Sequence, residues 1–187
     1  MFEKLIQLDK ELLVFLNGLG SPTYDGLWLI ITKQINWLPF FLLILYLLFK
    51  KIPLKQLLFT LLFVAILILV CDQTTNLFKN TIQRLRPCND LEISSIIRSV
   101  RKSDTFSYFS GHAANSMATM TFLFLIMRKF YKHAYLLFLF PLIFAYSRIY
   151  LGLHFPLDIL SGYLCGAVFG IVFYKLYKKY VINKITF

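Results

Sequence analysis

The sequence has few acidic residues, with 9 Asp and Glu against 20 Lys and Arg, and a formal net charge of +11. Such a surplus occurs in nucleic-acid-binding proteins, but here the cations stand in short clusters at the ends of apolar runs. That arrangement is typical of membrane topology, because cationic clusters meet anionic headgroups. The shortage of carboxylates also argues against an acidic metal cluster. We expect no nucleic-acid partner, no metal and no other cofactor.

Cysteine is equally scarce. Cys71 and Cys165 lie inside apolar runs and Cys88 lies in a polar loop, a spacing that fits neither a zinc site nor a disulfide pair. No linker rich in Gly, Ser or Pro and no internal repeat divides the chain. Acidic residues near the N-terminus do not fit a cleavable signal peptide, which needs basic residues and then an unbroken apolar stretch. The sequence predicts one domain over residues 1–187.

Apolar residues are abundant, at 58% of the chain. Runs long enough for membrane helices occur between polar segments. The sequence therefore predicts an all-α, polytopic helical membrane protein with five to six transmembrane helices. The spans that we expect are 36–49, a helix over 53–84 with its apolar part through 71, 113–127, 134–146 and 159–174.

The N-terminal region, residues 1–34, is expected to lie in the membrane interface. Residues 2–18 carry apolar side chains on one face and charges on the other, and the charges in the middle argue against spanning. Gly and Pro near residues 18–22 end this helix. Tyr24 to Gln34 predict a second short helix with Trp28 near the headgroups.

Charge at the predicted span ends indicates the topology. Ten cations mark one set of ends as cytoplasmic by the positive-inside rule, and seven cations mark the other set. We discount the seven because most lie beside histidine-containing elements, where an anionic ligand explains them. The sequence predicts a multi-pass protein of the cytoplasmic (inner) membrane with those elements facing the outer, periplasmic side. The ten are Lys50, Lys51, Lys55, Arg128, Lys129, Lys132, Lys175, Lys178, Lys179 and Lys184.

The only long polar loop spans residues 83–111. The helix before it, from Pro53 to Arg84, is about 48 Å long at about 1.5 Å per residue, so its last turns and Lys79 stand at headgroup level or above. A loop of this size in a compact protein is functional or disordered. We interpret it as an extramembrane active-site loop. Tyr108 and Phe109 in it either line a headgroup entrance or anchor the loop in the interface.

A second polar stretch, residues 147–158, joins the last two predicted spans. Pro156 restricts Phe155 to extended geometry and suits the first position of a helix, so His154 falls on the turn and Asp158 in the first helical turn. An Asp that accepts from one imidazole nitrogen fixes the tautomer and leaves the other nitrogen free as a base or nucleophile. A capping role for Asp158 is the plain alternative, but ionisable groups at a membrane indicate a functional site.

Three elements thus meet on the predicted outer face, and each suits a phosphate. They are Lys79 with Arg86-Pro87, then Ser110-Gly111-His112, and then Ser147-Arg148 with His154 and Asp158. Lys79, Arg86 and Arg148 supply positive charge, and arginine forks bind phosphate oxygens in pairs. Gly111 allows close backbone approach at a helix start whose amides point toward an anion. His112 and His154 then stand as an acid and a nucleophile on either side of one phosphorus.

In these elements the sequence resembles the type 2 phosphatidic acid phosphatase superfamily, in its membrane lipid phosphatase branch. The resemblance covers residues 79–158, with Phe109 where the family pattern usually has Pro. It implies that His154 attacks phosphorus to give a phosphohistidine, that Asp158 orients His154, and that His112 protonates the leaving group. It implies no metal. The residues that it places around the phosphate are Lys79, Arg86, Ser110, Gly111 and Arg148.

The expected partners are membrane lipids and a lipid phosphate or diphosphate substrate, with no obligate protein partner evident. We favour undecaprenyl diphosphate, since the site faces outward and the protein is minimal, which is an argument by analogy. Phosphatidylglycerol phosphate, phosphatidate and lipid A phosphates are the alternatives. A non-catalytic anionic-lipid binder or transporter is an alternative of another class, but a pure binder needs cations and not two histidines.

Overall fold

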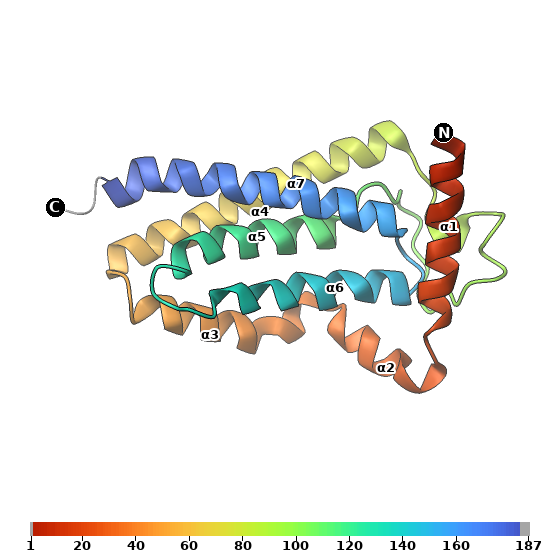
Figure 1. The fold of residues 1–187 in the computed structure, drawn as a ribbon, viewed down its shortest axis with the longest axis horizontal. Coiled ribbons are helices and arrows are strands. Elements are labelled where there is room, and N and C mark those ends of the chain that lie inside the picture. Colours follow the sequence, from red (N-terminus) through yellow and green to blue (C-terminus); the bar gives the residue numbers. More distant parts are fainter. Residues whose placement is uncertain (1, 184–187) are drawn as a thin grey trace.

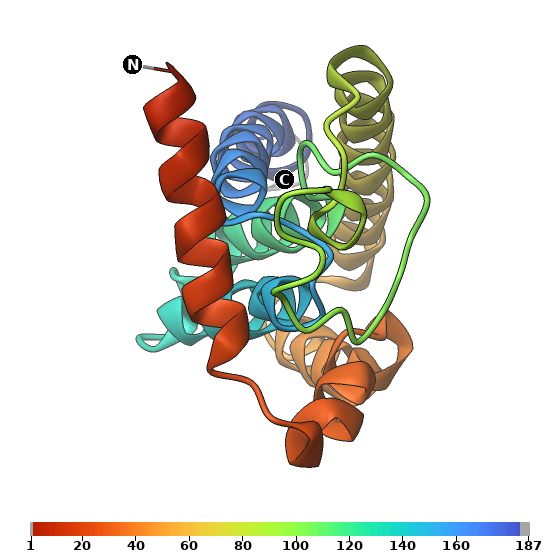
Figure 2. The ribbon, with the colours of Figure 1, turned by 90° about the vertical axis from the view of Figure 1, so that its right-hand side faces the viewer.

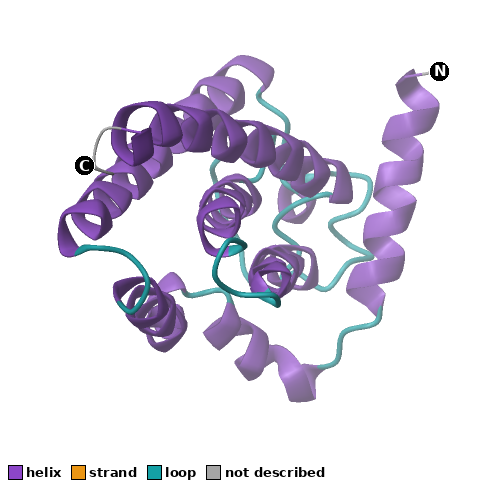
Figure 3. Ribbon diagram, turned by 60° about the vertical axis from the view of Figure 1, so that its left-hand side comes forward, coloured by secondary structure: helices purple, strands orange, loops and turns teal. Residues whose placement is uncertain are grey.

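The computed structural model describes residues 2–183, and all secondary structure in that range is helical (Figure 3). The prediction of an all-α protein is confirmed, while Lys184 of the predicted cationic set lies outside the described residues. The elements are α1 (Phe2–Gly18), α2 (Pro22–Ile31), η1 (Gln34–Trp37), α3 (Leu38–Phe49), α4 (Leu54–Ile82), η2 (Pro87–Asn89), α5 (Gly111–Met127), η3 (Ala134–Phe138), α6 (Leu139–Tyr150), α7 (Pro156–Tyr177) and η4 (Lys178–Ile182).

Helices α3, α4, α5, α6 and α7 run side by side along the longest axis, and α1 crosses one end of them (Figure 1). Helix α5 is the central element, because it packs against α4, α6 and α7. Most of its side chains are buried, from Ala113 near its start to Met127 at its end. The polar end of the bundle lies under α1 and loop 83–110, which Figure 2 shows from that side.

Three glycines allow α7 to lie directly on α5. Gly162, Gly166 and Gly170 repeat every four residues, so they share one face of α7. A Cβ on Gly166 would lie 2.3 Å from the carbonyl oxygen of Ala114, closer than real contacts allow. Small residues at this spacing bring two membrane helices into backbone contact. The packing fixes the start of α5 against the start of α7.

The N-terminal helix is amphipathic as predicted, and the structure shows which face meets the protein. Four of its apolar side chains are exposed, with Phe15 at 63% of its reference area. Asp9, Leu13 and Asn17, which repeat every four residues, are buried instead. Asn17 Nδ2 donates to the carbonyl oxygens of Ile149 at 3.0 Å and Tyr150 at 2.9 Å. The helix is therefore tied to the end of α6, and its exposed face carries Leu5, Leu8, Leu12 and Phe15.

Helix boundaries differ from the predicted ones mainly at polar ends. Helix α4 ends at Ile82 rather than Arg84, because Gln83 has a left-handed backbone with φ of 52°. Helix α5 starts at Gly111 rather than Ala113, since the Ser110 hydroxyl caps it by accepting from the Ala113 amide at 3.4 Å. Helix α6 continues to Tyr150, so Arg148 lies in its last turn and not in the connection. Pro156 opens α7, as predicted.

Within residues 2–183, two helical segments, Leu54–Asn89 and Pro156–Ile182, are long and apolar enough to cross a membrane. A third span results if α2 and the Gln34–Phe49 segment, bent by 72° against each other, count as one. The five to six spans expected from the sequence therefore stay a prediction. Fewer candidate spans result than the sequence predicts because α5 and Ala134–Tyr150 are shorter helices. Helix α5 also packs against α4, α6 and α7.

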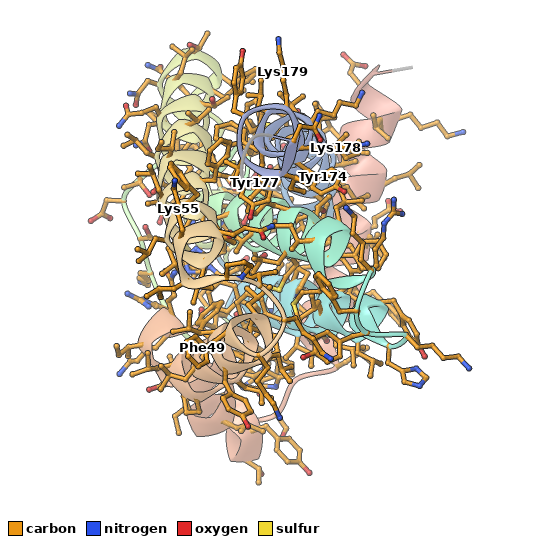
Figure 4. All side chains as sticks on the ribbon, turned by 90° about the vertical axis from the view of Figure 1, so that its left-hand side faces the viewer. Phe49, Lys55, Tyr174, Tyr177, Lys178 and Lys179 are labelled. Atoms are coloured by element: carbon orange, nitrogen blue, oxygen red, sulfur yellow. The ribbon has the colours of Figure 1, made fainter. Side chains whose placement is uncertain are left out.

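The predicted cytoplasmic cations gather at the end of the bundle away from α1. Those within residues 2–183 lie on the turn between α3 and α4, in the first turn of α4, on the turn after α5, in the last turn of α7 and in η4. Figure 4 looks onto this end and shows Lys55, Lys178 and Lys179 there. The histidine-containing elements lie at the opposite end, so the two charge sets of the sequence are separated along the bundle.

Candidate active site

Four helix ends meet beneath α1 and loop 83–110. They are the C-terminal ends of α4 and α6 and the N-terminal ends of α5 and α7 (Figures 1 and 2). Each end carries residues singled out in the sequence, although these lie far apart along the chain. Lys79 is on α4, Arg86 follows α4, Ser110 caps α5, Gly111 and His112 open α5, Arg148 is on α6, His154 precedes α7, and Asp158 is in the first turn of α7.

A cavity of about 550 Å³ lies at this junction. Six of the eight predicted site residues line it, and the other two, Ser110 and Asp158, are fully buried behind the lining. The structure thus brings the three sequence elements to one place. The six lining residues are Lys79, Arg86, Gly111, His112, Arg148 and His154.

Three cations in the lining have no carboxylate partner within residues 2–183. Arg86 donates instead to neutral groups, Thr105 at 2.8 Å and the Leu153 carbonyl at 2.9 Å. Arg148 donates to Thr32 Oγ1 at 2.8 Å, and its Nε has no partner among the described residues. With Lys79, they leave an excess of positive charge in a largely buried space, which an anion neutralises.

The imidazole of His154 is 1% exposed and is held from both sides. Its Nε2 lies 3.1 Å from Arg86 NH1. Because a guanidinium only donates, Nε2 presents its lone pair and Nδ1 carries the proton. Burial lowers the pKa of His154 to about 3. The ring is therefore neutral at physiological pH, which is the form that a nucleophile requires.

The protonated nitrogen of His154 faces two acceptors. Ser107 Oγ lies 3.3 Å from Nδ1, and Asp158 Oδ2 lies 3.4 Å from it. Ser107 donates its own proton to Asp158 Oδ2, so its oxygen is free to accept from Nδ1. Asp158 thus orients the ring both directly and through Ser107.

Asp158 also has the capping role that the sequence left as the alternative. Its Oδ2 accepts from the Phe155 amide at 2.9 Å, at the start of α7. Its Oδ1 accepts from Arg84 NH1 at 2.8 Å. A buried carboxylate with this many donors stays ionised and fixed in position. The two roles are compatible, since the same carboxylate caps α7 and accepts from the His154 imidazole.

His112 lies across the cavity end on α5. Its ring stacks on Phe144 of α6, with ring centroids 4.9 Å apart and planes at 23°. It is the second residue of α5 and lines the cavity together with Gly111, where an added Cβ would meet the Thr75 methyl at 3.4 Å. The Ser110 amide donates to the Asp158 carbonyl at 3.0 Å, which joins the starts of α5 and α7. The positive end of the α5 dipole therefore adds to the cationic lining.

Sequence reasoning missed three residues of this network. Arg84 was expected at the end of the helix over 53–84 and was given no role in the site, but it forms ion pairs with Asp158 at 2.8 Å and Asp9 at 2.7 Å. Ser107 carried no signal. Asp9 was placed among the interfacial charges, yet its Oδ1 accepts from the Leu157 amide at 2.8 Å and so caps α7 from a distant helix. The only signal for Asp9 was that Asp9, Leu13 and Asn17 follow one another at intervals of four residues, which places them on one face of the helix.

Other single residues have ordinary roles. Phe109 is buried and packs on Phe78, with ring centroids 5.3 Å apart, and Tyr108 donates to Ser161 at 3.1 Å, so neither lines the cavity. Cys88 is buried in the loop. Asp72 accepts from Asn115 at 2.6 Å, as a contact between α4 and α5.

The cavity continues away from the cations as a groove along α4. Its α4 lining runs from Thr60 to Lys79, which corresponds to about 28 Å at 1.5 Å per residue. That length is close to the thickness of a bilayer hydrocarbon core, about 30 Å. The α3 side is apolar, and Leu61 on the α4 side is 45% exposed, so the groove opens sideways. Its apolar lining includes Phe41, Ile44, Leu45, Leu48, Leu61, Val64, Ile68 and Leu123.

Comparison with known proteins gives a consistent assignment. The lipid A 4'-phosphatase of Bacteroides thetaiotaomicron is 34% identical over 183 residues, covering 96% of this chain and 81% of that protein. The undecaprenyl-diphosphatase of Sulfolobus acidocaldarius is 26% identical, covering 98% of this chain and 85% of its own. The transmembrane PAP2 type phosphatidylglycerolphosphate phosphatase of Bacillus subtilis shares the fold, with a TM-score of 0.71 at 20% identity over 95% of this chain and 88% of that chain.

The family model of the PAP2 superfamily matches residues 53–182, from α4 through η4. This segment contains every residue predicted for the site and more than half of the chain. The similarity to the Bacteroides thetaiotaomicron phosphatase extends beyond this segment, because the aligned region covers 96% of this chain. The protein belongs to the PAP2 superfamily.

Proposed function

We propose that this membrane-bound PAP2 phosphatase hydrolyses a lipid phosphate through a phosphohistidine on His154, without a metal. The observation that carries the proposal is the cavity itself. At one end, three unpaired cations face a neutral imidazole whose Nε2 lone pair is free apart from Arg86. At the other end, an apolar groove suits acyl or prenyl chains. No group of three His, Cys, Asp or Glu side chains placed to bind a metal occurs in residues 2–183.

The chemistry follows from these positions. The phosphate oxygens bind Lys79, Arg86 and Arg148. When the anion binds, Arg86 breaks its hydrogen bond to His154 Nε2 and donates to the phosphate instead. Nε2 attacks phosphorus, the bond from phosphorus to the lipid oxygen breaks, and His112 gives a proton to that oxygen. Water then attacks the phosphohistidine with its proton passing to His112, the P–N bond breaks, and inorganic phosphate leaves. Asp158 and Ser107 stabilise the charge that His154 acquires.

For the lipid, we favour a lipid A phosphate over undecaprenyl diphosphate, which the sequence alone had favoured. The relative named for lipid A 4'-phosphate is 34% identical, and the one named for undecaprenyl diphosphate is 26% identical. Both relatives cover nearly the whole chain, so the difference does not come from alignment length. Undecaprenyl diphosphate is the second candidate, since its phosphate would meet the same cations.

The proposed location is the cytoplasmic (inner) membrane, with the cavity on the periplasmic side. The separation of the two cationic sets supports this orientation, because the end opposite the histidines carries most of the cations that the positive-inside rule counts. The exposed apolar face of α1 fits a helix lying at the membrane surface around the site.

The test is phosphate release by the purified protein in detergent from a panel that includes monophosphorylated lipid A, undecaprenyl diphosphate and phosphatidate. We expect release by the wild type, and a loss of at least about 100-fold in the His154→Ala variant. A phosphorylated protein band that is stable to base and labile to acid should form in the wild type only. A wild-type protein that binds these lipids without releasing phosphate would favour the non-catalytic binder.

A further inference from the structure

One threonine of α4 behaves unlike the others. Helix α4 has four threonines, and three of them donate to the carbonyl four residues earlier: Thr60 at 2.9 Å, Thr74 at 2.8 Å and Thr81 at 2.9 Å. The hydroxyl of Thr75 makes no such bond and has no partner within residues 2–183, although the residue is 2% exposed. A buried hydroxyl without a partner is unfavourable, so the position of Thr75 needs a ligand or a structural reason.

A second unpartnered atom lies on the helix opposite. Asn115 of α5 gives its amide N–H to Asp72 Oδ1 at 2.6 Å, and this bond turns its Oδ1 away from Asp72. That Oδ1 is buried and has no donor among the described residues. Asp72, Thr75 and Asn115 all line the cavity. Two unpaired polar atoms from different helices thus border the same space.

Thr75 and Asn115 lie farther from the cationic end of the cavity than Lys79 and His112 do. Thr75 is four residues before Lys79 on α4, and Asn115 is three residues after His112 on α5. Because these two helices run in opposite directions, both steps lead away from the cationic end, by about 4.5 Å on α5 and about 6 Å on α4 at about 1.5 Å per residue. The pair lies one helical turn below the phosphate-binding residues, between them and the apolar groove.

We propose that Thr75 Oγ1 and Asn115 Oδ1, with Asp72 holding the Asn115 amide, form a second subsite that hydrogen-bonds a hydroxyl or amide group of the lipid. The proposal rests on the proposed function, because it takes the phosphate to bind Lys79, Arg86 and Arg148. An amide oxygen only accepts, and a hydroxyl both donates and accepts, so the subsite selects a substrate with an O–H or N–H near its phosphate. A phosphorylated glycolipid has such groups, whereas a prenyl or simple alkyl phosphate has only hydrocarbon there.

The test compares two phosphate monoesters, monophosphorylated lipid A and hexadecyl phosphate, which lacks hydroxyl and amide groups. Thr75→Val removes the hydroxyl at nearly constant shape, Asn115→Leu removes the acceptor, and Thr75→Ser keeps a hydroxyl. The matched control is Thr74→Val, because Thr74 is adjacent, satisfied within its own helix and absent from the cavity lining. Each variant is checked for monodisperse elution before assay.

We expect Thr75→Val and Asn115→Leu to lower kcat/KM about five- to tenfold on the lipid A phosphate, as for one lost hydrogen bond, and less than twofold on hexadecyl phosphate. Thr75→Ser and Thr74→Val should stay near wild type on both. Equal losses on both substrates, or no loss on either, would overturn the proposal. Should Asn115→Leu fail to fold, Thr75→Val decides the question alone.

Failure of the proposed function gives a different result. In that case the wild type releases phosphate from neither lipid, and the subsite is judged by the concentration of each lipid that raises the Tm of the protein. A preference for the glycolipid that Thr75→Val abolishes would support the subsite without catalysis. No preference in the wild type would overturn it.

Discussion

Arg84 donates to Asp158 Oδ1 at 2.8 Å, and the same guanidinium donates to Asp9 Oδ2 at 2.7 Å. Both carboxylates are almost fully buried. The N-terminal helix therefore contributes a charge to the network that orients His154, although it lies outside the segment that matches the family model. The Asp9 side chain does not line the cavity, so it acts on the site through Arg84 and through the start of α7.

Replacing Asp9 by Asn should lower kcat about tenfold and leave KM nearly unchanged. The substitution removes one of the two charges that hold Arg84 while the phosphate-binding cations stay in place, and breaking a buried charge pair is costly. Steady-state kinetics on one lipid phosphate measure both constants. Glu11→Gln makes the same chemical change at an exposed position of α1 and should have no effect. An effect on KM alone would mean that Asp9 affects binding and not the orientation of His154.

His112→Ala should harm poor leaving groups most. An aliphatic phosphomonoester leaves as a strongly basic alkoxide that needs a proton, whereas p-nitrophenolate is a weak base. We expect kcat/KM to fall at least about tenfold more on a lipid monophosphate than on p-nitrophenyl phosphate, when both are measured in wild type and variant. Equal losses would assign His112 to phosphate binding instead.

Vanadate should inhibit the enzyme, and chelators should not. The motivation is a cavity end lined by Lys79, Arg86 and Arg148, which suits a phosphate-like oxyanion. Phosphate release is measured with vanadate, with EDTA, and with EDTA followed by magnesium. Loss of activity in EDTA and its recovery with magnesium would show that the metal-free mechanism is wrong.

The orientation is testable with introduced cysteines. Native Cys88 is only 8% exposed and is therefore a poor reporter, whereas Leu91 in the same loop is 93% exposed. In right-side-out membrane vesicles, an impermeant thiol reagent should label Leu91→Cys and should leave Lys129→Cys unlabelled until the membrane is opened. The reverse pattern would place the cavity on the cytoplasmic leaflet.

Gly166→Ala should destabilise the bundle. The new Cβ would lie 2.3 Å from the Ala114 carbonyl oxygen and 3.0 Å from the Ala118 amide nitrogen, so α7 must move away from α5. Overpacking of this kind costs about 1–3 kcal/mol, and the Tm should fall by several degrees. Gly26→Ala is the control, because its added Cβ would have no atom within 4 Å. An unchanged Tm in Gly166→Ala would mean that the contact between α5 and α7 adjusts without cost.

The sequence predicted the helices well where apolar runs end in strong local signals. Pro156 at the start of α7 is the clearest case, since its ring geometry determines the boundary without help from tertiary structure. Arg148 shows the opposite. It was expected in a connecting turn because it is charged, but it lies inside α6, where its side chain reaches Thr32 and the cavity.

The site residues with recognisable spacing were predicted together, and the structure brings them together. Ser107 and Asp9 were missed because nothing local marks them. Their roles exist only after loop 83–110 and α1 fold over the starts of α5 and α7. The span count was uncertain for a related reason, since α5 is enclosed by its neighbours and its composition reflects protein contacts as much as a membrane.

The sideways opening of the groove along α4 affects how this enzyme meets its substrate. A lipid that enters through the flank of the bundle arrives by diffusion within the plane of the membrane and does not pass through water. Its effective concentration is then its mole fraction among the surrounding lipids. Adding inert lipid or detergent at constant total substrate should slow turnover as much as lowering the amount of substrate does, and rates measured in micelles of different size are comparable only on that surface scale.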